Sequence, residues 1–205
     1  MSILSPAQQL KSDKNAVRQS CLQRRDALDA QEREAKSASI CGHVLQHLIA
    51  NNLAENREIS VFLPIRSEVD LTGLLQPLAQ AGALLSLPVV LDKKTIVFRS
   101  HVPGDALVDA GFGTIGPPAE AQIVDPQLLL MPLAGFDRSG ARLGYGAGHY
   151  DRALQRLTAK GFFPLAIGIA FGLQEVPDVP VEAHDVPLAA IITENGVCEF
   201  EGKSE

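Results

Sequence analysis

Between residues 128 and 171 the hydrophobic pattern changes its period twice, and this order limits the folds that the chain can adopt. An apolar run at residues 128–133 is typical of a buried strand, and residues 150–160 have the pattern of a helix that ends at Gly161. A second apolar run follows at residues 165–171. Two strands joined by a helix usually lie parallel in one sheet, with a right-handed connection. We therefore expect a parallel strand–helix–strand unit in the fold.

The remainder of the chain supplies further elements of both kinds. Helices are expected at residues 13–28, from the cap Asp29 with Glu32 onward, and at residues 71–81. Short apolar runs predict strands at residues 59–63, 84–90 and 95–99. Residues 102–126 are dense in glycine and proline, which predicts a long irregular loop of the kind that is usually functional.

These elements predict an α/β fold. The 205 residues suit one domain better than two, so we expect a single domain over residues 1–205. Helices should cover both faces of a central parallel or mixed sheet, which gives a three-layer α/β/α, Rossmann-like architecture.

Composition and charge exclude several classes of protein. The chain is 46% hydrophobic, and its net charge of -6 offers no basic field for nucleic acid or an anionic membrane. It contains no apolar run as long as a membrane span, and its N-terminus has no signal-peptide pattern. Cys21, Cys41 and Cys198 are widely spaced, which suits a reducing compartment. We expect a cytoplasmic protein, a monomer, that binds neither nucleic acid nor membrane.

A glycine-rich turn carries the strongest functional signal. It lies between the strand at residues 128–133 and the following helix, and it reads Arg142, Leu143, Gly144, Tyr145, Gly146, Ala147, Gly148, His149, Tyr150, Asp151. Alternate glycines let backbone N–H groups approach an anion, and the helix N-terminus adds partial positive charge. The turn therefore predicts a phosphate cradle, although a tight connection without a ligand has the same pattern. It matches neither a Walker loop nor a dinucleotide GxGxxG motif.

Charged residues at the two ends of the turn favour a nucleotide. The guanidinium of Arg142 can clamp phosphate oxygens, whereas the Asp151 carboxylate would repel a phosphate unless a cation lay between them. Hard oxygen ligands make Mg²⁺ the expected cation. Asp185 could supply a second carboxylate from a loop at the same sheet edge, and its alternative role is a turn or cap.

Two further groups are candidate ligand contacts. Lys14 and Arg18 share one face of the first predicted helix, with Arg25 about two turns further along, and the alternative is a solvated cationic face. Glu68 follows the strand at residues 59–63 and could accept the neighbouring donors of a heterocycle such as a pterin. It could equally be a polar loop residue.

Several of these stretches together resemble a known family. Residues 61–70, 131–140, 142–152 and 167–171, with His184 and Asp185, are similar in order and spacing to 5-formyltetrahydrofolate cyclo-ligase, also called 5,10-methenyltetrahydrofolate synthetase. The resemblance implies an α/β enzyme that uses ATP with Mg²⁺. Its implied reaction converts 5-formyltetrahydrofolate to 5,10-methenyltetrahydrofolate and releases ADP and phosphate.

The resemblance also implies a role for each matching residue. ATP would contact Lys14, Arg18, Arg142, Leu143, Gly144, Tyr145, Gly146, Ala147, Gly148, His149 and Tyr150. The folate would contact Leu63, Glu68, Tyr145, Gly146, Ala147, Gly148 and His149. Asp151 and Asp185 would hold Mg²⁺, and no covalent nucleophile is implied.

Two departures from the family pattern put substrate affinity in doubt. His149 stands where a tyrosine is common, and Gly116 stands where a glutamate commonly precedes the proline. A non-catalytic relative that binds nucleotide and folate is the main alternative. An assignment as a sugar-phosphate isomerase or acyl-CoA enzyme would rest on fold analogy alone. Such an enzyme should act without ATP, so a requirement for ATP would distinguish a cyclo-ligase from it.

Overall fold

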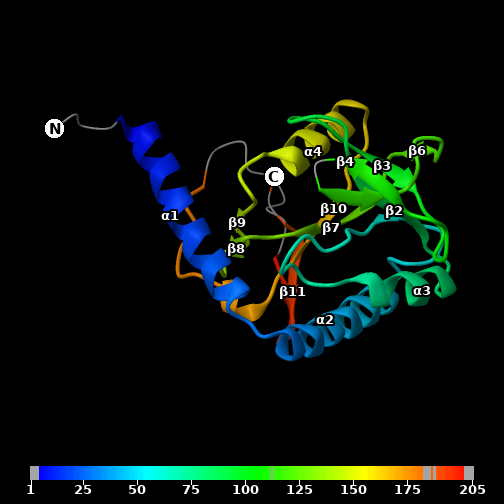
Figure 1. Cartoon of the computed structure of the whole chain (residues 1–205), viewed down its shortest axis with the longest axis horizontal. Coiled ribbons are helices and arrows are strands. Elements are labelled where there is room, and N and C mark those ends of the chain that lie inside the picture. The colour runs from blue at the N-terminus through cyan, green and yellow to red at the C-terminus, as the bar shows by residue number, and fades with distance from the viewer. Residues whose placement is uncertain (1–4, 112, 182–185, 187, 201–205) are drawn as a thin grey trace.

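The structure is a computed structural model, and it describes residues 5–111, 113–181, 186 and 188–200. Most of its described strands form one eight-stranded sheet, which Figure 1 shows between helices. The sheet order is β12 (Gly196–Glu199), β11 (Ala190–Thr193), β10 (Leu165–Ile169), β7 (Leu128–Pro132), β1 (Glu58–Ser60), β2 (Leu84–Val90), β3 (Ile96–Ser100) and β6 (Ile123–Val124). The five strands from β11 to β2 run parallel, and β12, β3 and β6 add antiparallel edges.

The predicted strand–helix–strand unit is confirmed. β7 leads through the glycine-rich turn into α4 (His149–Ala159), and the chain returns as β10. β10 pairs with β7 in parallel, with Leu165 opposite Leu128 and Ile169 opposite Pro132. The turn therefore stands at the carboxyl end of a buried central strand.

Helices cover both faces of the sheet, as the α/β prediction requires. Alternate residues of β7 point to opposite faces: Leu128 and Leu130 join one hydrophobic cluster, whereas Leu129 and Met131 join another. The first cluster contains the buried faces of α2 (Ala30–Ala50) and α3 (Thr72–Gln80), and the second contains that of α4. Figure 1 shows α2 and α3 on one side of the sheet and α4 on the other.

The first helix, α1, lies outside these layers. It spans Pro6–Asp26 and contacts η1 (Gly172–Gln174) and β8 (Gly135–Phe136), which pairs with β9 (Arg142–Leu143). It begins earlier than predicted because Ser5 and Gln8 form a capping box, with Pro6 at the first helical position. The cap predicted for the next helix is confirmed, since the Asp29 side chain accepts from the Glu32 N–H.

The prediction of an irregular loop over residues 102–126 is wrong in part. This segment contains the hairpin of β4 (Val108–Gly111) and β5 (Thr114–Gly116), followed by β6. Gly111 and Gly113 have φ angles of 78° and 74°, a conformation that suits a tight turn between two strands. The glycines that led to the prediction of an irregular loop therefore permit the turn of a short hairpin.

The strand order reverses between β1 and β7. From β1 the chain moves through α3 to β2 on one side, whereas the later strands β7, β10 and β11 build the other side. Such a switch point leaves a crevice outside the carboxyl ends of the two strands, where open α/β sheets bind ligands. The segments that follow β1 and β7 contain Glu68 and the glycine-rich turn.

Candidate active site

A cavity of about 550 Å³ opens at this switch point. Its lining comes from α1, the segments after β1 and β7, strands β2, β3 and β5, and the turn before α4. It gathers every predicted site residue that the structure describes: Lys14, Arg18, Leu63, Glu68, Arg142, Leu143, Gly144, Tyr145, Gly146, Ala147, Gly148, His149, Tyr150 and Asp151. Asp185 lies outside the described residues. The ligand contacts of the whole set stay predictions.

The glycine-rich turn has the backbone form that an anion site requires. Gly146 and Gly148 have φ angles of 91° and 65°, whereas Gly144 does not need a positive φ. Gly148 is the N-cap of α4 and offers no side chain to the N–H groups of the first helical turn. These N–H groups and the helix dipole are therefore available to a negatively charged ligand.

α1 brings its cationic face against this turn. Val17 and Leu22 pack against Leu143 and its neighbours, and Gly135 allows the close approach, since a Cβ there would lie 2.9 Å from Cys21 Sγ. Arg18 Nε donates to the Gly144 carbonyl at 2.7 Å. Arg18 is therefore not merely solvated, because it bonds the turn and is partly buried, and this burial lowers the pKa of its guanidinium.

Arg142 and Asp151 form an ion pair at the foot of the turn. The Arg142 side chain is 7% exposed, and it also donates to the Val186 carbonyl. Asp151 lies in the first turn of α4, where a negative charge is favourable. Within the described ranges no group of three or more His, Cys, Asp and Glu side chains could by itself hold a metal ion. A metal here would need ligands from elsewhere, such as phosphate oxygens.

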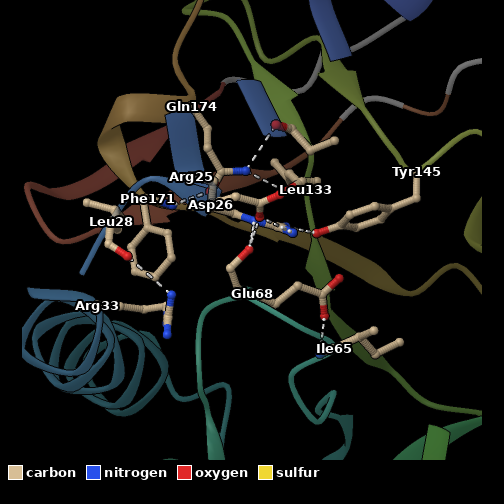
Figure 2. A network of polar contacts seen from close by, with 12 residues as sticks. Arg25, Asp26, Leu28, Arg33, Ile65, Glu68, Leu133, Tyr145, Phe171 and Gln174 are labelled. Atoms are coloured by element: carbon tan, nitrogen blue, oxygen red, sulfur yellow. Dashed lines mark hydrogen bonds and ion pairs between the residues drawn. The ribbon is translucent and has the colours of Figure 1, made fainter. Parts of the chain in front are cut away.

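Glu68 is a buried carboxylate that lines the same cavity from the segment after β1. It is 6% exposed, and it accepts the Ile65 N–H at 2.9 Å, as Figure 2 shows. Burial raises the pKa of the Glu68 carboxyl, while hydrogen bonds from Ile65 and Tyr145 and the charge of Arg25 oppose that rise. Glu68 is thus a polar loop residue, but a buried one, and its contact with a ligand stays a prediction. A carboxylate held in such a wall is available to paired N–H donors.

Arg25 was predicted to share the helix face of Lys14 and Arg18 but was assigned no ligand. Arg25 is 3% exposed. Its Nε donates to Ser67 Oγ at 2.9 Å, and its guanidinium also donates to the Tyr145 hydroxyl. Its guanidinium carbon lies 5.5 Å from the centroid of the Tyr145 ring. The only sequence signal was its position on the same helix face as Lys14 and Arg18.

Known proteins of one family resemble this chain over most of its length. The sequence profile of the 5-formyltetrahydrofolate cyclo-ligase family matches residues 10–194. The chain belongs to this family. Cyclo-ligases of Haemophilus influenzae and Mycolicibacterium smegmatis are 33% and 30% identical, over 80% and 88% of this chain and 89% and 93% of theirs. The chain is thus an enzyme of the cyclo-ligase class.

Solved structures of the family have the same fold. The NMR structure of Aquifex aeolicus 5,10-methenyltetrahydrofolate synthetase superposes with a TM-score of 0.75 at 30% identity, covering 94% of this chain and 95% of the other. The Mycoplasma pneumoniae synthetase superposes with a TM-score of 0.71 at 27% identity, covering 89% of this chain and 99% of the other. The family fold therefore applies to almost the whole chain.

The cyclo-ligase cavity also has an apolar wall that was not predicted from the sequence. Leu87, Val90 and Ile96 line it from β2 and β3, and Thr114 and Ile115 line it from the hairpin strand β5. Ile115 is 57% exposed, so an apolar side chain at the rim remains uncovered. The available signal was the length of the loop that contains the hairpin, because loops of that length are usually functional.

His149 is the departure from the cyclo-ligase pattern that faces the cavity. Its Nε2 atom is buried and has no hydrogen-bond partner among the described residues. A buried polar atom without a partner costs free energy, so a ligand that supplies one would be favoured here. Gly116, the other departure, is buried beside Val89 of β2.

Proposed function

We propose that this chain catalyses the ATP-dependent conversion of 5-formyltetrahydrofolate to 5,10-methenyltetrahydrofolate, with release of ADP and phosphate. One observation carries the proposal: a single cavity joins an uncapped helix N-terminus to a buried carboxylate. The helix N-terminus suits the phosphates of ATP, and the Glu68 carboxylate suits the N–H donors of a pterin. The names of the relatives agree with this assignment.

The reaction needs no nucleophile from the protein. The formyl oxygen on N5 attacks the γ-phosphorus, and the bond to the bridging oxygen breaks so that ADP leaves. N10 then attacks the activated formyl carbon, the carbon–oxygen bond breaks, phosphate leaves and N10 loses its proton. The chain's task is to align the two substrates and to neutralise phosphate charge. In our proposal Lys14, Arg18 and the glycine-rich turn hold ATP, and Leu63 and Glu68 orient the folate.

The residues present fit a magnesium ion. Asp151 lines the cavity and offers hard oxygen ligands, and Mg²⁺ sites commonly combine one or two carboxylates with phosphate oxygens and water. We propose Asp185 as the second ligand, and in favour of it Val186, the next residue in the sequence, bonds to the arginine that also pairs with Asp151. When bound, the ion would neutralise charge on the phosphates.

An assay of the purified chain tests the proposed reaction. Near-ultraviolet absorbance of the methenyl product should rise only when 5-formyltetrahydrofolate, ATP and Mg²⁺ are all present. EDTA or a non-hydrolysable ATP analogue should abolish the rise. Equal turnover without ATP would refute the proposal, and binding of both substrates without turnover would identify a non-catalytic relative.

Lys14 should serve ATP more than folate, because an ammonium group on the cavity wall suits phosphate oxygens. We expect Lys14→Ala to raise the KM for ATP about tenfold, equivalent to roughly 1.4 kcal/mol, and to leave the KM for folate nearly unchanged. Lys11→Ala is the matched control, since Lys11 is exposed on the same helix and does not line the cavity. A larger effect on folate than on ATP would contradict the assignment.

Two broader expectations remain part of the proposal. None of the described helices is both long enough and apolar enough to span a bilayer. We propose that the enzyme acts as a cytoplasmic monomer on small-molecule substrates, without nucleic-acid or membrane partners. Sedimentation of the purified chain, with and without its substrates, would test the monomer.

A further inference from the structure

Arg25 connects the two halves of the cavity wall. It projects from α1 toward Tyr145 in the glycine-rich turn, as Figure 2 shows, and it also donates to Ser67 in the segment after β1. The same helix holds the turn at a second point, through the bond from Arg18 to the Gly144 carbonyl. α1 therefore ties the predicted phosphate site to the predicted folate site through two arginines.

The contacts of Arg25 continue to Glu68. Arg25 donates to the Tyr145 hydroxyl, and both Tyr145 and Arg25 act to lower the pKa of the Glu68 carboxyl. Since the hydroxyl accepts from Arg25, its own proton remains available to an acceptor. Arg25 also donates to Ser67, the residue before Glu68. One guanidinium thus holds the residue before Glu68 and the tyrosine that acts on its carboxyl.

Arg25 is buried, so it is not simply a charged surface residue. A cation that is 3% exposed loses most of its hydration, and here its hydrogen-bond partners are Ser67 and Tyr145. Its nearest paired carboxylate, Asp26, lies at 3.7 Å and is itself largely exposed. The planar fork of an arginine bonds Ser67 and Tyr145 with donors in a fixed geometry, whereas the donors of a lysine are rotatable and sit on a flexible stem.

We propose that Arg25 is a positioning residue for folate binding: it sets the Tyr145 hydroxyl and the Glu68 carboxylate in the geometry that receives the pterin. This inference rests on the proposed function of the cavity. Arg25 acts through Tyr145 and Ser67, so its loss should weaken folate binding much more than ATP binding.

Calorimetry on Arg25→Met tests this role. Methionine retains much of the side-chain length and removes the donors, so the Kd for 5-formyltetrahydrofolate should rise about tenfold, while the Kd for ATP changes less than about twofold. The matched control is Arg24→Met, because Arg24 is the exposed neighbour on α1 and does not line the cavity. The control should bind both ligands as the unmodified chain does.

The pH dependence of folate affinity separates positioning from general disruption. Glu68 is faced by Arg25, Tyr145, Tyr150 and the Ile65 N–H. Burial raises the pKa of both phenols, so these tyrosines stay neutral as the pH falls. Arg25 lowers the pKa of Glu68, so its removal raises that pKa further. Folate affinity of Arg25→Met should therefore begin to fall at a higher pH than that of the unmodified chain.

The outcomes are distinct. Folate binding that is unchanged in Arg25→Met, or weakened equally at every pH, overturns the inference. If Arg25→Met does not fold, Arg25→Lys keeps the charge but not the fork, and normal folate affinity in that variant overturns the inference as well. Failure of the unmodified chain to bind 5-formyltetrahydrofolate would instead overturn the proposed function.

Discussion

Replacing Asp151 with asparagine is expected to lower turnover by at least about a hundredfold, because loss even of a residue that only supports a metal ligand typically costs ten- to a hundredfold. Asp151 lines the cavity in the first turn of α4, beside the N–H groups proposed to hold phosphate. Without its charge a magnesium ion would lose a protein ligand. Steady-state rates at several magnesium concentrations measure the effect, and excess Mg²⁺ should restore part of the activity.

The ion pair with Arg142 provides the rival explanation for such a loss. If Asp151 only holds Arg142, extra Mg²⁺ should have no effect on the variant. Asp125→Asn is the matched control, because Asp125 pairs with Lys160 at 2.8 Å and does not line the cavity. Asp185→Asn should behave like Asp151→Asn, and the double variant should lose less than the sum of the two, since ligands of one ion act as a unit. Full additivity would argue against a shared metal.

Local patterns were sufficient to predict the central part of the fold. The change of period between residues 128 and 171 predicted β7, α4 and β10, because a strand and a helix bury different faces of their sequence. Because the two strands were expected to be parallel, the glycine-rich turn was also predicted to lie at the sheet edge where the strands end. The cap at Asp29 was also predictable, since it depends only on residues within one helical turn.

Features that depend on distant partners were not predictable in the same way. Arg25 is separated by 42 residues from Ser67 and by 120 from Tyr145, so no local pattern marks its burial. The hairpin of β4 and β5 was missed because glycine suppresses a strand signal even where it serves a turn. Glu68 could be placed at a sheet edge from the sequence, but its surroundings include Arg25 and Tyr145, which are distant from it in the sequence.

The burial of Glu68 leads to opposite expectations for binding and for stability. A carboxyl whose pKa is raised in the folded chain favours folding only in its protonated form, and this contribution is lost as pH rises through the folded pKa. At neutral pH the charged form therefore opposes folding. Glu68→Gln should keep or raise the Tm at neutral pH, because the amide oxygen can still accept the Ile65 N–H.

Folate binding by Glu68→Gln should weaken roughly ten- to a hundredfold, because a hydrogen bond to a charged acceptor is worth about 1.5 to 3 kcal/mol. ATP affinity should barely change, since the phosphates are assigned to the backbone N–H groups of the glycine-rich turn and of α4 rather than to Glu68. In the unmodified chain folate affinity should fall as the pH is lowered through the raised pKa of Glu68, and the glutamine variant should lack this fall. Calorimetry at several pH values measures both effects, with Glu34→Gln as the exposed control on α2. Unchanged folate affinity in Glu68→Gln would contradict the assignment of Glu68 to the folate-binding site.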